Sequence, residues 1–191
     1  MLGPILCVAA YLLGSISFGL LVARWRGIDL RHQGSGNVGA TNVGRVVGAR
    51  EGRWVLVLDA AKGLVPVVAA RAAGLDDAWI AGIATLAVTG HCFPIWHRFE
   101  GGKGAATAAG VMLGAVPIAG VIAVATYVVA KRATRRASVG SLGGALVGAI
   151  ACTIEHGTGP LGIMSWAIAA LVLLRHHDNI VRLARGEEPP S

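Results

Sequence analysis

The chain has 191 residues, of which 54% are hydrophobic and 14% are charged, and its mean hydropathy is +0.65. This composition excludes an ordinary soluble domain and indicates a polytopic helical membrane protein, a single domain over residues 1–191 with no room for a soluble module. The net charge of +7 raises the question of a nucleic acid partner. Because the basic residues lie in short loops beside apolar runs, an anionic lipid surface and anionic substrates explain the charge better, and no nucleic acid is expected.

The predicted elements are apolar runs, since a transmembrane helix needs ~20 mostly apolar residues. Uncharged runs of this kind cover residues 2–23, 78–96, 105–130, 137–154 and 157–174. A further run, residues 54–70, is similar but contains Asp59 and Lys62. The first run has no basic segment before it, which is typical of a retained helix rather than a cleaved signal. Cys7, Cys92 and Cys152 fall within apolar segments and form no C-x-x-C pair, so they are expected to be small core residues.

Two polar, glycine-rich segments interrupt the apolar pattern, at residues 34–45 and 100–104. Glycines let backbone N–H groups approach an oxyanion closely, and serine, threonine and asparagine add neutral donors. Arg45 and Lys103 add one cation to each segment. Together the segments predict a site for phosphorylated ligands at the membrane surface, in re-entrant-like loops.

The first segment formally matches the G-x-G-x-x-G dinucleotide pattern, with Asp59 twenty residues beyond Gly39. That interpretation is rejected, because the fingerprint needs a preceding strand and a βαβ unit, whereas an apolar helix and an arginine-rich loop come first here. Lys103 is not a Walker lysine either, since Gly104 follows it where serine or threonine would bind magnesium.

The basic residues predict the topology. Lysine and arginine gather in residues 24–53, 98–103, 131–136 and 175–185, and the positive-inside tendency favours one cytoplasmic face for all four clusters. A straight helix over residues 105–130 would place two clusters on opposite faces. Pro117 disrupts this run, so a hairpin of two short helices is predicted. The result is seven transmembrane segments with the N-terminus outside and the C-terminus inside; six spans with one long kinked helix is the alternative.

Two further pairs of polar residues are candidates for function. Asp59 and Lys62 share one helical face inside an apolar run, which indicates either a structural ion pair or a substrate contact. His176 and Asn179 stand three residues apart at the end of the last run, where the imidazole suits a base or a phosphate partner. Capping is the structural alternative for Asn179. No set of residues has metal-ligand spacing, and neither a metal nor a cofactor is expected.

Four sequence blocks resemble the bacterial integral-membrane acyl-phosphate:glycerol-3-phosphate acyltransferases, and they cover nearly the whole chain. The blocks are residues 34–42 (GSGNVGATN), 59–63 (DAAKG), 91–107 (HCFP through FEGGKGAAT) and 175–187 (RHHDNIVRL through GE). The resemblance implies a seven-spanning protein of the bacterial inner membrane whose active site faces the cytoplasm. It also implies acyl transfer from acyl phosphate to the 1-hydroxyl of glycerol 3-phosphate, giving lysophosphatidic acid and phosphate for phospholipid synthesis.

Carried over position by position, the resemblance assigns the site residues. The catalytic set is Ser35, Arg45, Lys103, His176 and Asn179, and the substrate-binding set is Gly36, Asn37, Thr41, Asn42, Lys62, Gly101, Gly102 and Gly104. Glu187 belongs to the third motif in a structural role. The partners implied are glycerol 3-phosphate, acyl phosphate and the lipid bilayer, with no obligate protein partner evident.

The sequence departs from the family pattern at Glu100, where a lysine is usual, and in the strongly basic residues 131–136. Because acyl phosphate is already activated, the protein must mainly align the hydroxyl and stabilise charge. Either His176 or the donor's own phosphate oxygens then take the proton. Ser35 is expected to bind phosphate rather than attack, since no base adjoins it. A transporter, or an enzyme that uses acyl-CoA, is disfavoured because neither an inverted repeat nor an H-x-x-x-x-D motif is evident.

Overall fold

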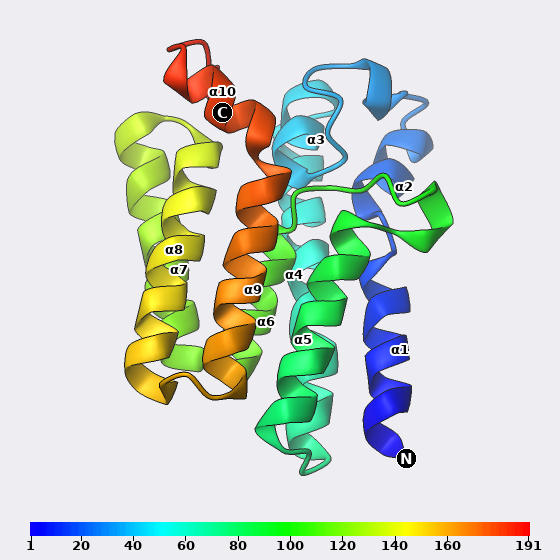
Figure 1. The fold of residues 1–191 in the computed structure, drawn as a ribbon. Coiled ribbons are helices and arrows are strands. Elements are labelled where there is room, and N and C mark those ends of the chain that lie inside the picture. The colour runs from blue at the N-terminus through cyan, green and yellow to red at the C-terminus, as the bar shows by residue number, and fades with distance from the viewer.

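The computed structural model describes residues 1–191 as a bundle of α-helices without strands. The helices stand side by side, with the N-terminus at one end of the bundle and the C-terminus at the other (Figure 1). The elements in chain order are α1 (Leu2–Gly14), α2 (Phe18–Trp25), η1 (Leu30–His32), α3 (Ala40–Val46), α4 (Ala49–Ala72), α5 (Asp77–Cys92), η2 (Ile95–His97), α6 (Ala105–Ala115), α7 (Pro117–Thr134), α8 (Ala137–His156), α9 (Pro160–Arg175) and α10 (His177–Ala184).

Four helical stretches are long and apolar enough to cross a membrane: Leu2–Trp25, Asp77–His97, Pro117–Thr134 and Ala137–His156. The apolar helices α6 and α9 are shorter. An all-helical architecture suits a bilayer, because each helix satisfies its own backbone hydrogen bonds where no water is available. Cys92 and Cys152 are buried and Cys7 is half-buried, and none forms a disulfide.

The first apolar run is broken, which its composition did not predict. Between α1 and α2, Ile16 leaves the helical pattern, and its carbonyl oxygen accepts a hydrogen bond from Lys62 Nζ at 2.6 Å. Lys62 also pairs with Asp59 at 2.8 Å, and both side chains are almost fully buried. The lysine therefore caps a freed backbone carbonyl inside the bundle, which is one of the accepted ways to satisfy a helix break in a membrane.

The run at residues 105–130 is broken too, at the predicted place. α6 ends at Ala115, Val116 adopts an extended φ of −140°, and Pro117 begins α7. Figure 1 shows that α6 runs toward one end of the bundle and α7 returns to the other. A Cβ on Gly120 would lie 2.7 Å from the backbone nitrogen of Leu113, so the two helices pack at backbone contact.

Because α6 is shorter than α7, the second glycine-rich segment, which precedes α6, lies deeper in the bundle than the C-terminal end of α7. α6 has 11 residues and α7 has 18, so α6 is shorter by ~10 Å at 1.5 Å per residue. α6 also packs closely on α4, where a Cβ on Gly110 would lie 2.0 Å from the carbonyl oxygen of Ala60. This packing holds Lys103, just before α6, near the elements that carry Arg45, and it sets the depth of the candidate site.

Candidate active site

A cavity of about 900 Å³ opens among the three motif regions of the chain. Its lining includes most of the predicted site residues: Ser35, Asn37, Thr41, Asn42, Arg45, Lys103, Gly104, His176 and Asn179. Four predicted residues, Gly36, Lys62, Gly101 and Gly102, are not among the residues that line it. The deeper wall is apolar and comes from α6, α7, α8 and α9, with Met112, Leu113, Val124 and Ile168 among its members. The cavity thus joins a polar mouth to an apolar interior.

The first glycine-rich segment is held in shape by its own asparagines. The Asn42 side chain accepts from the Ser35 backbone N–H at 2.9 Å and donates to the Gln33 carbonyl at 3.0 Å. Asn37 accepts from the Gly39 N–H at 2.9 Å. Both asparagines were predicted to contact substrate; the Asn42 amide is used within the loop, whereas Asn37 Nδ2 has no partner in the protein. The hydroxyls of Ser35 and Thr41 also make no hydrogen bond within the protein, so these three groups are side-chain donors left for a ligand.

The second segment is held by other elements of the structure. The Gly102 N–H donates to the His91 carbonyl at 3.1 Å, while the carbonyls of Gly101 and Gly102 accept from the Arg175 guanidinium at 2.8 and 3.1 Å. A Cβ on Gly102 would lie 2.2 Å from His91 Nε2, so only glycine lets the ring pack there. The two glycines therefore position Lys103 and do not themselves face the cavity.

Lys103, Asn179 and Glu188 form a hydrogen-bonded series at the cavity. Lys103 Nζ donates to Asn179 Oδ1, and Asn179 Nδ2 donates to Glu188 Oε1 at 2.5 Å. Because a carboxylate only accepts, Glu188 turns the amide so that its oxygen faces the lysine. Burial lowers the pKa of Lys103, and the nearby Arg182 lowers it further. An anionic ligand beside Lys103 would offset both effects.

Glu188 was not predicted as a site residue; sequence reasoning considered its neighbour Glu187. The Glu188 carboxylate also accepts from Ser138 Oγ and Arg182 Nε, each at 2.7 Å, and the residue is buried. Although burial acts to raise its pKa, these hydrogen bonds hold the pKa below its usual value. Two adjacent glutamates give no local signal that would distinguish them, because the partners are distant in sequence.

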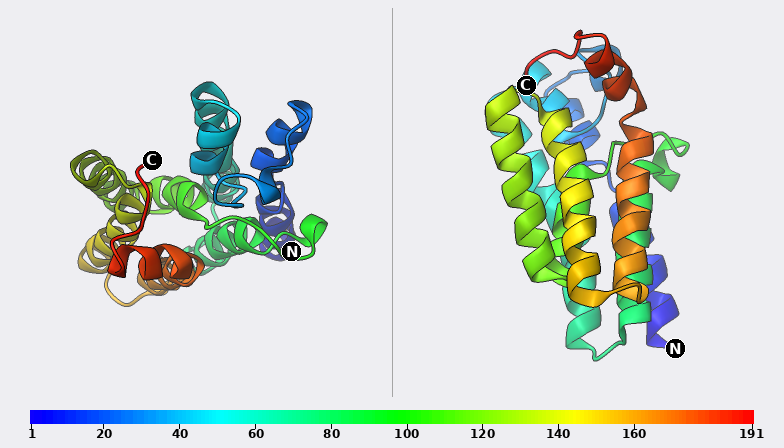
Figure 2. Two further views of the ribbon diagram at one scale, coloured as in Figure 1. Left: turned by 90° about the horizontal axis from the view of Figure 1, so that it is seen from above. Right: turned by 60° about the vertical axis from the view of Figure 1, so that its left-hand side comes forward.

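The C-terminal tail runs from α10 toward α7 and α8 (Figure 2), and Glu187, Pro189 and Ser191 of the tail line the cavity. The Pro190 carbonyl accepts from Arg45 at 3.1 Å, and the Glu188 carbonyl accepts from Arg136 Nε at 2.8 Å. Ser191 is bonded to the loop between α7 and α8 through the Arg135 carbonyl at 2.8 Å. Arg136 therefore holds the tail, although the sequence indicated only a topology-setting charge there.

His176 lies just beyond the end of α9 and is buried. Its Nδ1 donates to the Val172 carbonyl at 2.8 Å, which leaves Nε2 without a partner in the protein. Burial lowers the pKa of His176 to about 4, and the positive charges of Lys103 and Arg175 act in the same direction. The imidazole is therefore neutral at physiological pH and offers Nε2 as an acceptor.

The remaining charges near the cavity are paired with other groups of the protein. Asp59 lines the cavity, but it is paired with Lys62, which faces Ile16 and does not line the cavity, so the structure favours the structural ion pair. Glu100, the departure from the family pattern, pairs with Arg31 of η1 and so ties the second glycine-rich segment to the loop that precedes the first. The first turn of α6 lines the cavity and adds the positive end of a helix dipole. No group of three His, Cys, Asp or Glu side chains is placed to hold a metal ion.

The fold and the site define a helical membrane protein with a cavity that has cationic side chains at its mouth and an apolar interior. Residues 4–186 match the family described as glycerol-3-phosphate acyltransferase. Among curated relatives, a glycerol-3-phosphate acyltransferase of Anaeromyxobacter sp. (strain Fw109-5) is 47% identical, with 98% of this chain and 95% of the relative covered. One of Myxococcus xanthus (strain DK1622) is 46% identical, with 96% of each covered.

Solved structures agree with the sequence relatives. The chain matches crystal structures of PlsY (YgiH), an integral membrane glycerol 3-phosphate acyltransferase. In the glycerol 3-phosphate form the identity is 35% and the TM-score 0.95, with 100% of this chain and 96% of that chain covered. In the lysophosphatidic acid form the identity is 34% and the TM-score 0.92, with 100% and 95% covered. The chain belongs to the glycerol-3-phosphate acyltransferase family and is an integral membrane acyltransferase, which confirms the family predicted from its motifs.

Proposed function

We propose that the protein transfers a fatty acyl group from acyl phosphate to the 1-hydroxyl of glycerol 3-phosphate, releasing inorganic phosphate and 1-acyl-glycerol 3-phosphate. The observation that supports this most strongly is the shape of the cavity, whose polar mouth holds Arg45 and Lys103 and whose interior is apolar. Both proposed substrates carry a phosphate, and the donor also carries an acyl chain. One cavity of about 900 Å³ offers cations for the phosphates and an apolar wall for the chain.

Each group in the mouth has a proposed role. Arg45 and Lys103 bind the two phosphates by charge-assisted hydrogen bonds, and Ser35 and Thr41 add hydroxyl donors. Asn179, fixed by Glu188, holds Lys103 in place. The positive end of α6 favours the charge that develops on the carbonyl oxygen and the leaving phosphate. The acyl chain lies along the apolar wall and enters from the bilayer between helices.

The proton of the attacking hydroxyl goes to the donor phosphate in this proposal. A base transfers protons best when its pKa lies near the working pH, and the pKa of His176 is lowered to about 4 by burial. The neutral Nε2 of His176 instead accepts a hydrogen bond from the 2-hydroxyl of glycerol 3-phosphate and so orients the acceptor, which leaves the proton of the attacking 1-hydroxyl free for the donor phosphate. The carbonyl carbon gains the glycerol oxygen as it loses the phosphate, and the proton leaves with that phosphate.

The decisive test is the choice of donor. Purified protein is incubated with glycerol 3-phosphate and either palmitoyl phosphate or palmitoyl-CoA, with Lys103→Ala as the matched inactive control. Formation of 1-palmitoyl-glycerol 3-phosphate from the acyl phosphate alone is expected. Turnover with the CoA ester alone would overturn the donor assignment, and movement of substrate into liposomes without acyl transfer would overturn the enzymatic role.

We also propose seven transmembrane segments in the bacterial inner membrane, with the N-terminus outside and the site on the cytoplasmic face. The segments are α1 with α2, α4, α5, α6, α7, α8 and α9, and the second glycine-rich segment is re-entrant-like. Cysteines replacing Glu100 and Arg132, both exposed, probe the hairpin in a background lacking the three native cysteines. An impermeant reagent should label both from the cytoplasmic side, whereas labelling from opposite sides would favour six spans.

A further inference from the structure

A second cleft, of about 400 Å³, lies between α2, the loop that follows it and η2. It shares no lining residue with the active-site cavity. Leu20 and Leu21 form an apolar wall, and Arg24 follows them on α2. Asp29 and His97 are the other polar side chains of the lining, which Gly27, Ile28 and Leu30 complete. The mixture of an apolar wall with one arginine and one aspartate is unusual for a surface that only faces lipid chains.

Arg24 is the unpaired charge of this region. Its guanidinium is exposed and forms no ion pair or side-chain hydrogen bond, whereas Arg26 pairs with Glu51 and Arg31 pairs with Glu100. Asp29 accepts from the Arg31 N–H at 3.1 Å and lies 2.8 Å from His32 Nδ1, and its side chain stays 65% exposed. The hydrogen bond with His32 lowers the pKa of Asp29, so its carboxyl is charged at neutral pH.

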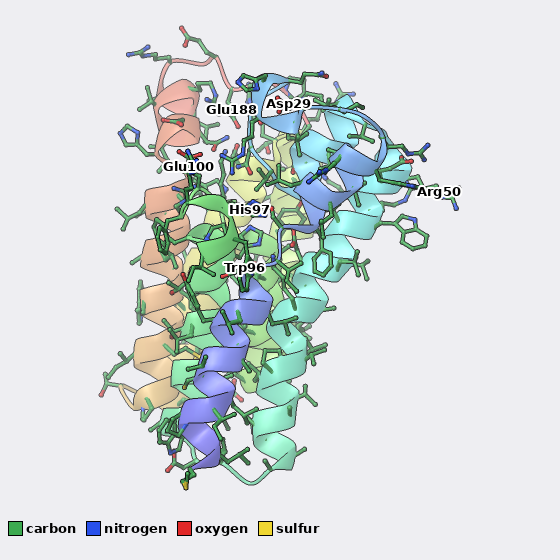
Figure 3. The ribbon with its side chains drawn as sticks, turned by 90° about the vertical axis from the view of Figure 1, so that its right-hand side faces the viewer. Asp29, Arg50, Trp96, His97, Glu100 and Glu188 are labelled. Carbon is green, nitrogen blue, oxygen red and sulfur yellow. The ribbon has the colours of Figure 1, made fainter.

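Two tryptophans beside the cleft indicate that it lies at the depth of lipid headgroups. Trp25 and Trp96 flank it and are 78% and 59% exposed, as expected for tryptophans anchored at a membrane interface. Leu20 and Leu21 belong to the last turns of a helical stretch long enough to span the bilayer. Asp29 lies farther toward the C-terminal end of the bundle than Trp96 and His97 (Figure 3).

We propose that this cleft binds the headgroup of a membrane phospholipid that carries a primary ammonium group, of the phosphatidylethanolamine type. The cleft presents an apolar wall, a cation and an anion, which are the partners that the acyl chain, the phosphate and the ammonium of such a lipid require. Arg24 binds the phosphate, and Asp29 accepts a hydrogen bond from the ammonium. A phosphatidylglycerol headgroup offers Asp29 only neutral hydroxyl donors, which bind a carboxylate more weakly than an ammonium does, and a choline headgroup has no N–H to donate.

The test is native mass spectrometry of the full chain released from detergent with equal amounts of phosphatidylethanolamine, phosphatidylglycerol and phosphatidylcholine of one acyl composition. We expect the wild-type protein to retain the ethanolamine lipid about two- to fivefold more than either other lipid, the range of one exposed ion pair. Asp29→Asn should abolish that preference. Arg24→Ala should reduce retention of all three lipids by about fivefold, as expected for one basic residue at a membrane surface.

Arg50→Ala is the matched control, since Arg50 is exposed and points away from the cleft (Figure 3). It should leave lipid retention unchanged, and none of the three substitutions should change acyltransferase activity, which also shows that the variants fold. An Asp29→Asn variant with wild-type lipid preference would overturn the proposal, as would equal losses for Arg24→Ala and Arg50→Ala.

Discussion

The two glycine-rich segments have similar compositions but are built in different ways. The first closes on itself through Asn37 and Asn42, and its glycines Gly34 and Gly36 serve turns with positive φ. The second has almost no internal bonds and is held from outside by His91 and Arg175. Glycine therefore supplies conformational freedom in one segment and close approach to a neighbouring element in the other.

The cations of the two segments differ accordingly. Lys103 is half-buried, recessed in the bundle and held by Asn179. Arg45 is exposed at the mouth, and its only protein partner is the carbonyl of Pro190 in the tail. A fixed charge in a water-poor site stabilises developing charge better than a mobile exposed one. We therefore expect Lys103 to act mainly on the transition state and Arg45 mainly on binding.

The largest effect is expected from Lys103→Ala. Loss of a preorganised charge at the reacting phosphate should reduce kcat by ~10²- to 10³-fold in steady-state assays of inserted protein. Arg132→Ala, which removes an exposed charge that forms no ion pair or side-chain hydrogen bond, is the control and should stay within about twofold. Equal losses in the two variants would mean that general surface charge, and not a positioned lysine, drives the reaction.

The next effect concerns the scaffold of the second segment. Gly102→Ala places a Cβ 2.2 Å from His91 Nε2 and must displace the backbone that carries Lys103, which should reduce kcat by about 10²-fold. Gly44→Ala, inside α3 of the first segment, meets its nearest atom at 3.8 Å and should be close to neutral. If the two variants had equal kcat values, the close packing of His91 on Gly102 would not be needed for activity.

Arg45→Ala should have a smaller effect, carried by KM. Removal of an exposed charge-assisted contact to phosphate is expected to raise KM about tenfold while kcat changes little. Measuring both constants over a range of substrate concentrations separates the two. A fall in kcat as large as that of Lys103→Ala would show that Arg45 also acts in the transition state.

The smallest expected effects come from the two adjacent glutamates, Glu187 and Glu188. Glu188→Gln keeps an acceptor oxygen but removes the charge that orients Asn179, and it should reduce activity about three- to tenfold, within the range of one ordinary hydrogen bond. Glu187 makes no side-chain hydrogen bond in the structure, and Glu187→Gln should stay within about twofold. The opposite ranking would restore the motif assignment made from the sequence.

Sequence reasoning worked best where the signal was local. The run at residues 105–130 contained a proline and broke there, and the motif residues with free side chains gather at one cavity. It did not find the break at Ile16, because the freed carbonyl is capped by Lys62, which lies 46 residues away in sequence. The contact between the C-terminal tail and the site was missed for the same reason, since Arg45 and Pro190 lie 145 residues apart in sequence.

The glycine assignments show a second limit. Composition predicts that glycine-rich segments bind anions, but it does not tell which N–H groups stay free. Gly102 donates to the His91 carbonyl, and the carbonyls of Gly101 and Gly102 bind Arg175. Those bonds come from elements far along the chain, so only the three-dimensional arrangement separates a glycine that faces the ligand from one that packs.

The central claim is that the protein holds and orients two phosphates and leaves the proton to the donor. The pH dependence of kcat/KM for His176→Gln tests it most directly, with insertion and folding checked independently. The account predicts that this variant keeps substantial activity and an unchanged acid limb, because a histidine with pKa about 4 is already neutral over the working range. A loss of ~10²- to 10⁴-fold together with a flattened profile near the ordinary histidine pKa of ~6.5 would make His176 the general base and contradict the account.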